Sequence, residues 1–308
     1  QLDPQILLSN NIRLFYNHEG ASLPEKCNGL GYSNLICIVA HIVGFYNEIK
    51  DKKNNVNLIF IEEPEVHMHP QMQTVFIRRI SQFLSDVELD AQVILTTHSS
   101  HIISASKFDS IRYFKPIPEA KRAIVKDLMD FNEKLTEIET REFLQQYLTL
   151  GKCDLFFADK AIFFEGTVDR ILLPLFTSKI DEQRKTCILS EQYISSIEVG
   201  GAYISKFKEL LEFLELKTLI ITDIDSVQKE ASGTRVSYKK VAVKTNQDLL
   251  TSNITLKTWI PGREKVDDLL KKDIPKETAN SLIRVAYPLS VDNDSVKCGR
   301  SFEEAFII

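Results

Sequence analysis

Four carboxylates stand at or near the ends of predicted buried strands, where they could hold a divalent cation. Glu165 follows the strand-like run 161–164, and Asp169 falls in the first turn of the helix predicted after it. Asp223 and Asp225 close a later apolar run, and they are expected to point the same way because side chains two positions apart on a strand share a face. Open α/β sheets bind ligands beyond the carboxyl ends of their strands, so we expect all four carboxylates to meet in one crevice.

Carboxylates crowded in this way repel one another unless a cation neutralises them, and oxygen ligands favour Mg²⁺ or Mn²⁺ over zinc. A Glu-Gly or an Asp-x-Asp at one strand end also occurs by chance. The ordered set is far more specific, because Glu-Gly-x-x-Asp is followed by Gly200-Gly201 after a strand and then by Asp-x-Asp after the next strand. Gly166 permits the tight turn from strand to helix that this arrangement needs. The set therefore predicts a catalytic metal site.

A second set of residues lies in the N-terminal part of the chain. Glu62 and Glu63 follow the strand-like run 57–61, and adjacent carboxylates in that position suit Mg²⁺ binding and orientation of an attacking water. His98 follows the run 92–97 and is expected at the same edge of the sheet. A histidine delivered there can contact a γ-phosphate and report its presence.

Small residues precede the first long helix, in the run Gly-Leu-Gly-Tyr-Ser-Asn that contains Gly31 and Ser33. Backbone N–H groups at such a helix start can hold a phosphate, although this pattern alone is weak. The chain contains no G-x-x-x-x-G-K-[ST] phosphate loop, and Gly151-Lys152 lacks both the upstream glycine and the following hydroxyl. We therefore expect the chain to begin partway through a nucleotide-binding module and not to hydrolyse ATP alone.

Alternating helical and strand-like segments predict two α/β units with mostly parallel sheets. The first unit is expected to contain helix 33–50, strand 57–61, a helix from Pro70, and strand 92–97. The second is expected to contain strand 161–164, helix 168–178, strand 194–199, helix 203–214 and strand 217–222. Residues 119–150 are charged and helical without a strand signal, which predicts a helical connector. The predicted domains are therefore 1–116, 117–158 and 159–308.

These motifs resemble those of the OLD family of nucleases, in which an ABC-type ATPase is followed by a Toprim domain. The segment EEPEVHMHPQ, with TTHS after it, is similar to the OLD and RecF-like branch of ABC-type ATPases. The segments LFFADKAIFFEGTVDRILLP, Thr251-Ser252-Asn253 and GRSFEEAF look like the OLD version of Toprim. The resemblance covers about residues 29–308 and implies the C-terminal half of an ABC-type ATPase sheet, a helical connector, and a Toprim domain with a mostly parallel sheet.

The resemblance also implies roles for the N-terminal residues. Glu62 would assist Mg²⁺, Glu63 would polarise the attacking water, and His98 would be the switch histidine. Gly31 and Ser33 would complete the ATP site of a partner subunit across a dimer. A homodimer or higher homo-oligomer is therefore expected.

The activity implied by the resemblance is an ATP-regulated, Mg²⁺- or Mn²⁺-dependent DNA endonuclease or nickase in bacterial anti-phage defence. Glu303 would join the acidic set at a second metal position. With two metals, one would activate a water and the other would stabilise the departing 3′ oxygen. Glu165 would instead be a general acid/base if the site works as in other Toprim enzymes. In the Gabija anti-phage system, whose large subunit shares this plan, the partner is a helicase-like protein.

Other functions stay open. A topoisomerase or a primase also carries Toprim, but the first needs a tyrosine nucleophile in a separate domain and the second usually carries a zinc module. An ATP-driven DNA-binding clamp of DNA-repair type, with a degenerate Toprim, is a non-enzymatic alternative that the intact acidic set argues against. A zinc site at His67 and His69 is disfavoured because His-x-His lacks a clear third and fourth ligand.

Basic residues follow the Asp-x-Asp run in a stretch that looks like a loop: Lys229, Arg235, Lys239, Lys240 and Lys244. They could contact DNA phosphates beside the metals, and a solvated loop is an equally good interpretation. Arg300 is a candidate for a basic group near the scissile phosphate.

The overall composition is that of an ordinary globular protein, with 308 residues, 44% hydrophobic and 26% charged. The five cysteines are scattered, which predicts reduced thiols in an intracellular protein. No apolar run approaches the ~20 residues of a membrane span and the N-terminus does not look like a signal peptide, so we expect a cytoplasmic protein. A net charge of −5 does not exclude a DNA-binding protein, because DNA contacts need only a local basic face.

Overall fold

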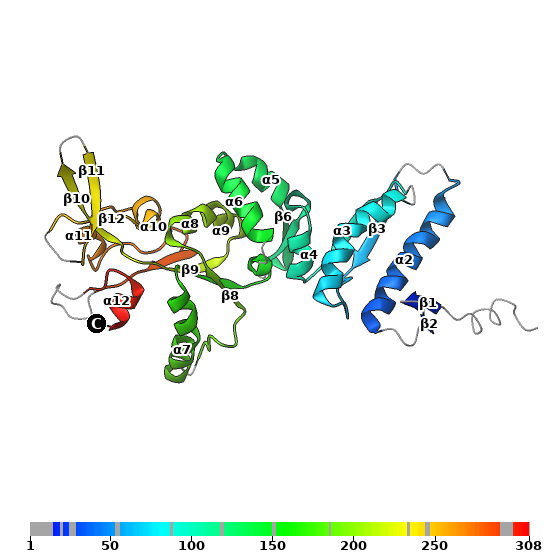
Figure 1. Cartoon of the computed structure of the whole chain (residues 1–308), viewed down its shortest axis with the longest axis horizontal. Helices are drawn as coiled ribbons and strands as arrows, with labels where there is room; N and C mark the ends of the chain where they lie inside the picture. Colours follow the sequence, from blue (N-terminus) through cyan, green and yellow to red (C-terminus); the bar gives the residue numbers. More distant parts are fainter. Residues whose placement is uncertain are drawn as a thin grey trace, which may run out of the picture. The chain divides into compact units, whose positions relative to one another are not determined.

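The computed structural model describes residues 15–18, 21–24, 29–52, 56–86, 89–117, 120–149, 152–184, 186–232, 235–243, 247–289 and 298–307. The chain divides into two compact units, Gln1–Lys107 and Phe108–Ile308. Figure 1 labels the helices and strands in chain order.

The first unit contains the helices and strands that the sequence predicts, with ends shifted by a few residues. Its elements are β1 (Phe15–His18), β2 (Ala21–Pro24), α2 (Leu30–Ile49), β3 (Leu58–Glu62), α3 (Pro70–Asp86), β4 (Gln92–Thr96) and α4 (Ser100–Ala105). Strands β3 and β4 are parallel, and Glu62 lies opposite Thr96 in their register. Both strands therefore end at the same edge, which brings Glu63 and the His98 segment together.

Local sequence explains where two of these helices begin. Pro70 opens α3, where the missing N–H of proline costs nothing because a first-turn donor has no partner within the helix. The Ser99 side chain accepts hydrogen bonds from the backbone N–H groups of His101 and Ile102, so Ser99 caps α4.

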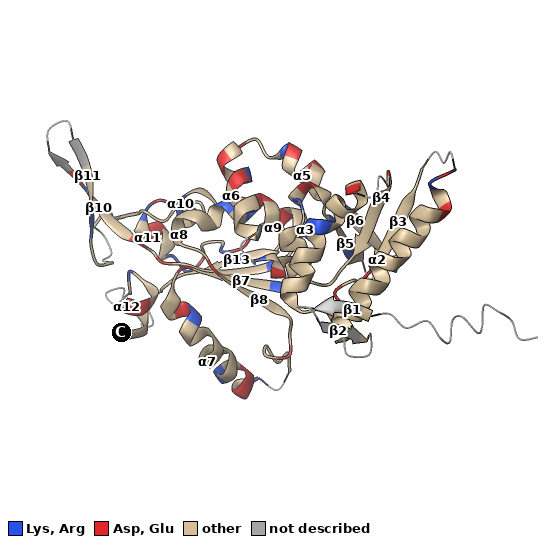
Figure 2. Cartoon of the chain, turned by 45° about the vertical axis from the view of Figure 1, so that its right-hand side comes forward, with Lys and Arg blue, Asp and Glu red and all other residues tan. Residues whose placement is uncertain are grey.

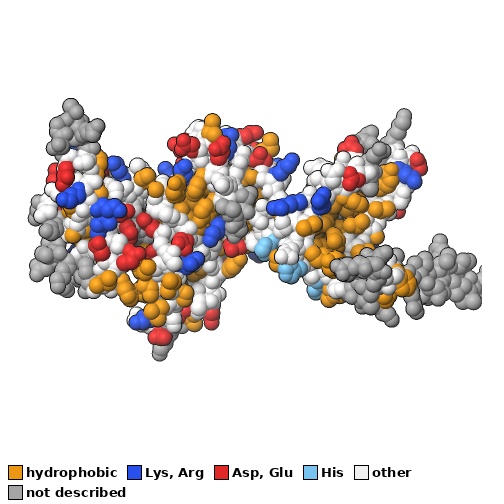
Figure 3. Space-filling model, viewed as in Figure 1, with side chains coloured by type: hydrophobic (Ala, Val, Ile, Leu, Met, Phe, Trp, Pro, Cys, Tyr) orange, Lys and Arg blue, Asp and Glu red, His pale blue; other side chains and the backbone are white. Residues whose placement is uncertain are grey.

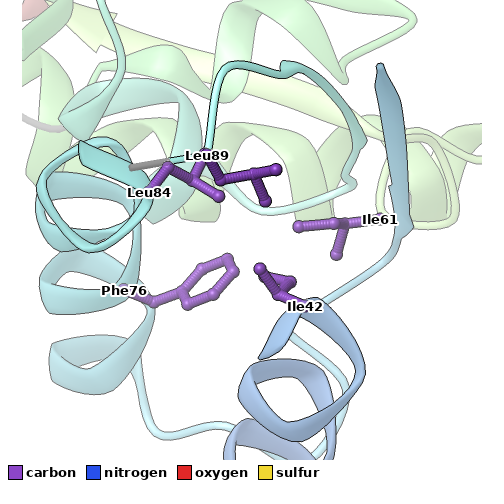
Figure 4. Close-up of a cluster of buried hydrophobic side chains, with 5 residues drawn as sticks. All are labelled: Ile42, Ile61, Phe76, Leu84 and Leu89. Carbon is purple, nitrogen blue, oxygen red and sulfur yellow. The ribbon is translucent and has the colours of Figure 1, made fainter. Parts of the chain in front are cut away.

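A compact apolar cluster holds this unit together. Five buried side chains from α2, β3, α3 and the segment before β4 face one another in Figure 4: Ile42, Ile61, Phe76, Leu84 and Leu89. Helix α2 is the only described helix long and apolar enough to cross a membrane by length and composition, which corrects the expectation that no such run exists. Its Ile42 is buried in this cluster, and Ile38 and Phe45 pack against it.

The second unit is built on a parallel four-stranded sheet in the order β13-β9-β7-β8. Its strands are β7 (Lys160–Phe164), β8 (Ile194–Glu198), β9 (Lys217–Ile221) and β13 (Ile283–Ala286). Phe164 lies opposite Ile221 in the register of β7 and β9, so these strands end at the same level. The residues that follow, Glu165 and Thr222, therefore emerge side by side. Such sheets are buried on both faces, and Phe163 and Ile220 are fully buried here.

Helices connect and cover these strands: α7 (Thr167–Gln183), α8 (Gly201–Ile204), α9 (Lys208–Leu214), α10 (Ile254–Thr258), α11 (Val266–Leu269) and α12 (Phe302–Ile307). The prediction of one helix over 203–214 is only partly correct, because a 3-10 turn at Ser205–Phe207 separates α8 from α9.

The predicted helical connector is wrong over residues 122–127. Strands β5 (Arg112–Ile117) and β6 (Arg122–Asp127) form an antiparallel hairpin, followed by α5 (Leu128–Lys134) and α6 (Ile138–Thr149). Lys115 and Lys126 donate hydrogen bonds from this hairpin to the Glu215 carboxylate at the end of α9. These partners lie far away in sequence, so local periodicity carries no sign of them. Strand β5 begins before the predicted boundary at residue 116 and belongs to the second unit.

The predicted loop after the Asp-x-Asp run is also wrong. Strands β10 (Ser226–Ser232) and β11 (Arg235–Lys240) pair in an antiparallel ribbon, and β12 (Leu250–Thr251) pairs with the base of β10. Polar residues mark solvent-exposed strands as readily as loops, because cross-strand hydrogen bonds do not require a hydrophobic face.

Candidate metal centre

Three of the predicted carboxylates meet at the carboxyl edge of the parallel sheet. Glu165, Asp223 and Asp225 each offer an oxygen, and these oxygens all lie within 4.8 Å of one another. All three side chains are partly buried. Figure 3 shows acidic side chains gathered on one face of the second unit, beside a group of Lys and Arg side chains. An all-carboxylate donor set of this kind suits a hard divalent cation.

Donors on neighbouring segments orient the Glu165 carboxylate. Thr222 Oγ1 donates to Glu165 Oε1, and the backbone N–H of Asp223 donates to the same oxygen over 3.1 Å. Burial raises the pKa of Glu165, while these hydrogen bonds oppose the rise. A Cβ at Gly201 would lie 2.3 Å from Glu165 Oε2, so only glycine lets the chain approach this carboxylate so closely.

Asn253 is a site residue to which the sequence assigned no role. Its Nδ2 donates to Glu165 Oε1 over 2.9 Å and also contacts Thr222 Oγ1 and the Asp223 carbonyl oxygen. Its Oδ1 accepts from the backbone N–H of Leu256, which makes Asn253 the N-cap of α10. An asparagine just before a helical run is a recognisable N-cap signal, but nothing local indicates its contact with Glu165.

Asp223 and Asp225 are held in different ways. Asp223 accepts a hydrogen bond from the backbone N–H of Phe302 over 2.8 Å. Burial, with repulsion from Glu165 and other nearby carboxylates, raises the pKa of Asp223 to about 7. Asp225 has a positive φ of 50°, and its Oδ1 lies 2.5 Å from Arg300 Nη2. Arg300 thus lies against the acidic group with little of its side chain exposed.

Asp169 and Glu303 lie beside this group rather than within it. Asp169 Oδ2 accepts from the backbone N–H of Gly166 over 3.0 Å, at the start of α7. A Cβ at Gly166 would lie 3.4 Å from Asp169 Oδ2 and 4.0 Å from Glu303 Oε1, so both carboxylates border the same glycine. Burial raises the pKa of Asp169, and repulsion from Glu303 adds to the rise. The two acids form a second, adjacent pair.

In the first unit, the structure brings Glu63 and His98 together. His98 Nε2 lies 3.3 Å from Glu63 Oε1, and both side chains are largely exposed, as is Glu62. Glu65, which the sequence analysis did not single out, fixes this geometry. Its Oε1 accepts hydrogen bonds from Thr97 Oγ1 and from the backbone N–H of His98, over 2.8 Å and 2.6 Å.

The small residues at the start of α2 pack within the same unit. Gly31 is buried, and a Cβ there would lie 2.4 Å from the His67 carbonyl oxygen. Asn34 donates from Nδ2 to the carbonyl oxygens of Pro64 and Val66. Ser33 is partly buried. Gly31 is therefore required for the close approach of α2 to the segment after the acidic pair.

The structure describes some of the remaining residues that the sequence singled out as zinc ligands or DNA contacts. Among the described residues, the only group of at least three potential metal ligands is the acidic one, so His67 and His69 gain no further ligands for zinc. Lys239 Nζ lies 3.9 Å from Glu230 Oε1, and Lys240 is exposed. Lys244 and the side chain of Arg235 lie outside the described residues.

Comparison with known proteins gives two family matches along the chain. Residues 2–103 match the family described as AAA ATPase domain, and residues 156–225 match the Toprim domain described as overcoming lysogenization defect protein-like. The second match contains four of the predicted metal-site acids: Glu165, Asp169, Asp223 and Asp225.

Curated relatives show the same combination. Endonuclease GajA of Bacillus cereus strain HuB5-5 is 30% identical over 99% of this chain and 44% of its own length. The OLD nuclease of Thermus scotoductus is 24% identical over 70% of this chain and 39% of its own length. The Old nuclease of Escherichia phage P2 is 23% identical over 88% of this chain and 47% of its own length. The chain thus spans less than half the length of each of these relatives. It belongs to the OLD family, with an AAA-type ATPase region followed by an OLD-like Toprim domain.

Proposed function

We propose that the protein is a divalent-metal-dependent DNA endonuclease or nickase whose activity is regulated by ATP. The observation that carries this proposal is the group formed by Glu165, Asp223 and Asp225 at the carboxyl edge of the Toprim sheet. The names of the relatives, endonuclease and nuclease, support the same reaction class.

The residues present fit Mg²⁺ or Mn²⁺. Carboxylate oxygens are the ligands these ions prefer, and the raised pKa of Asp223 records a crowding of charge that a cation would relieve. We assign Glu165, Asp223 and Asp225 to one metal position, and Asp169 with Glu303 to a second. Metal ions bound there would supply an activated water and stabilise the departing oxygen.

The chain's own residues would prepare the site for this reaction. Asn253 and Thr222 hold Glu165 in one orientation, either as a metal ligand or as the base that takes a proton from the attacking water. Arg300, held against Asp225, is our candidate for the basic group beside the scissile phosphate.

We propose that the first unit contributes to an ATP site. Glu62 and Glu63 would bind Mg²⁺ and orient water, and His98, which contacts Glu63, would respond to the γ-phosphate. Ser33 would act across a subunit interface, with the buried Gly31 setting the position of the helix start, which implies a homodimer or higher homo-oligomer. ATP turnover would also require a phosphate loop, and this sequence contains none.

The biological setting is proposed from the family alone. We expect a cytoplasmic protein that acts on DNA in anti-phage defence, with a helicase-like protein as its class of partner. Among the basic residues after the metal site, Lys240 is a candidate for DNA contact, whereas Lys239 lies near the Glu230 carboxylate.

Supercoiled plasmid incubated with the full chain and Mg²⁺ or Mn²⁺ tests the reaction. Nicked or linear product is expected, and Asp223→Asn should abolish it while leaving DNA binding largely intact. Relaxed closed topoisomers would indicate a topoisomerase instead, and binding without any change in the plasmid would favour the clamp. Unimpaired cutting by Asp223→Asn would remove the assigned site.

A further inference from the structure

The ribbon formed by β10 and β11 starts at the metal centre. Ser226, the first residue of β10, directly follows Asp225. The described strands of the ribbon extend away from the four-stranded sheet (Figures 1 and 2). Because the ribbon begins next to a metal-site acid, it is a candidate for contact with the DNA that flanks the reacting phosphate.

The base of the ribbon is fixed to the metal centre by several hydrogen bonds. Ser226 Oγ donates to the Val241 carbonyl oxygen, and Thr251 Oγ1 donates to the Ile224 carbonyl oxygen, both over 2.5 Å. The backbone N–H of Ser252 donates to the Asp225 carbonyl oxygen over 3.0 Å. The strands therefore leave the site in a defined direction.

The strand register gives the ribbon two different faces. Lys229 lies opposite Tyr238, and Lys240 lies opposite Val227, on what we call the Tyr238 face. On the other face, which we call the Glu230 face, the opposed pairs are Gln228 with Lys239 and Glu230 with Ser237. Side chains that lie directly opposite each other in an antiparallel pair share a face, so this division follows from the register alone.

The two faces differ in charge. On the Glu230 face, Lys239 is balanced by the Glu230 carboxylate 3.9 Å away. On the Tyr238 face, Lys229 and Lys240 are exposed, and no acidic side chain of the described residues forms an ion pair with either. Tyr238, with 58% of its surface exposed, lies directly opposite Lys229 and two positions before Lys240 on the same strand. Within the described part of the chain, the Tyr238 face thus carries two positive charges without an acidic partner, beside an exposed phenol.

The base of the ribbon is also connected to the metal centre through β12. Thr251 of β12 lies opposite Ser226 of β10. Two residues after Thr251, Asn253 donates a hydrogen bond to Glu165. The ribbon and the acidic group are therefore held by the same short segment of chain.

We propose that Lys229, Tyr238 and Lys240 bind the phosphate backbone of duplex DNA next to the bond that is cut. The ammonium groups would pair with phosphates, the phenol would donate a hydrogen bond to one, and a two-stranded ribbon has the width that a major groove admits. Lys229 is four residues beyond Asp225, or ~13 Å along a strand. With one phosphate per ~3.4 Å of axis on each strand, the contact would fall about four base pairs from the scissile bond. This proposal rests on the proposed DNA-cleaving function.

Adjacent lysines on opposite faces provide the test. Lys240→Ala removes a charge from the Tyr238 face, and Lys239→Ala removes the same charge from the Glu230 face. Binding of a labelled duplex is measured by fluorescence anisotropy over a series of salt concentrations, with every variant in the Asp223→Asn background to prevent cutting. Lys229→Ala/Lys240→Ala is expected to raise Kd roughly tenfold and to lower the slope of log Kd against log salt by about 1.8, or ~0.9 per lost phosphate contact. Lys239→Ala should have a smaller effect than Lys240→Ala.

Three outcomes would overturn the proposal. An equal loss of duplex affinity in Lys239→Ala and Lys240→Ala would mean that the two faces of the ribbon contribute equally to DNA binding. An unchanged salt slope in the double variant would place the DNA elsewhere. A loss seen only with a single-stranded probe would replace the duplex by an unpaired strand stacked on Tyr238. Thermal unfolding of each variant checks that the fold is intact.

Failure of this proposal is distinguishable from failure of the proposed function. Unchanged duplex affinity and salt slope in the double variant, with plasmid cutting by the same double variant when it retains Asp223, would refute the ribbon contact and leave the nuclease assignment in place. Absence of cutting by the unmodified chain, with its DNA binding still dependent on Lys229 and Lys240, would remove the nuclease and keep the contact.

Discussion

Asn253 Nδ2 lies 2.9 Å from Glu165 Oε1, although the two residues are 88 positions apart in the chain. The same side chain caps α10 through its other polar atom. One buried amide therefore joins the start of a helix to an acid of the metal centre, so disturbing it should affect both.

Two substitutions of Asn253 separate these roles. Asn253→Asp keeps the oxygen that caps α10 but replaces the donor with a second carboxylate facing Glu165. Asn253→Ala removes the cap as well, which costs ~1 kcal/mol of stability, more if buried groups lose their partners. Both should abolish most plasmid cutting and weaken Mn²⁺ binding measured by calorimetry, while only Asn253→Ala loses the cap. Wild-type Mn²⁺ affinity in Asn253→Asp would show that Asn253 only caps the helix.

Gly201→Ala should damage the site more than it damages the fold. The added Cβ would lie 2.3 Å from Glu165 Oε2, so the carboxylate must leave the donors that hold it. Gly200→Ala is the matched control, because the nearest atom to its Cβ would be Tyr203 Cδ2 at 3.9 Å. We expect at least a tenfold loss of cutting rate for Gly201→Ala alone, or ~1.4 kcal/mol in the barrier. Comparable cutting rates in Gly201→Ala and Gly200→Ala would contradict the close approach of Gly201 to the Glu165 carboxylate.

The pKa of Asp223 predicts how metal-free stability depends on pH. Burial and neighbouring carboxylates raise this pKa from 3.8 to about 7. The folded protein then holds a proton that the unfolded chain releases, so stability falls as pH rises through this window. Urea unfolding in the presence of EDTA should show that the free energy of unfolding falls more between pH 5 and pH 8 for the wild type than for Asp223→Asn. Mg²⁺ should reverse the loss in the wild type, because a ligand of the folded state stabilises it. Parallel pH profiles for the two proteins would count against the charge crowding.

Glu63→Gln should block ATP turnover in a chain that also carries a phosphate loop. The amide cannot orient or polarise an attacking water as the carboxylate does, although nucleotide binding should persist. Glu48→Gln, an exposed change on α2, is the control. Phosphate release and binding of a fluorescent ATP analogue measure the two steps. Turnover at the wild-type rate in Glu63→Gln would refute the role of Glu63.

Local sequence patterns predicted most of the strands and helices that carry the site. Buried strands appear as short apolar runs, and carboxylates just after two of these runs predicted where Glu165, Asp223 and Asp225 meet. The same pattern predicted the position of Asp169 in the first turn of α7, because the turn from strand to helix sets that position. These predictions need only the period of a strand or helix and the geometry of a parallel sheet.

Tertiary structure alone decided the contacts between distant segments. Arg300 joins Asp225 across 75 positions, and Asn253 joins Glu165 across 88, which no local pattern records. The ribbon was predicted as a loop because its exposed strands carry few apolar residues, and β6 was predicted as part of a helix because its pairing with β5 is decided by packing. The sequence by itself determined which acids end which strands. Only the folded chain determined which donors orient them and which lysines share a face of the ribbon, since hydrogen bonds and strand pairing depend on where two segments lie in space.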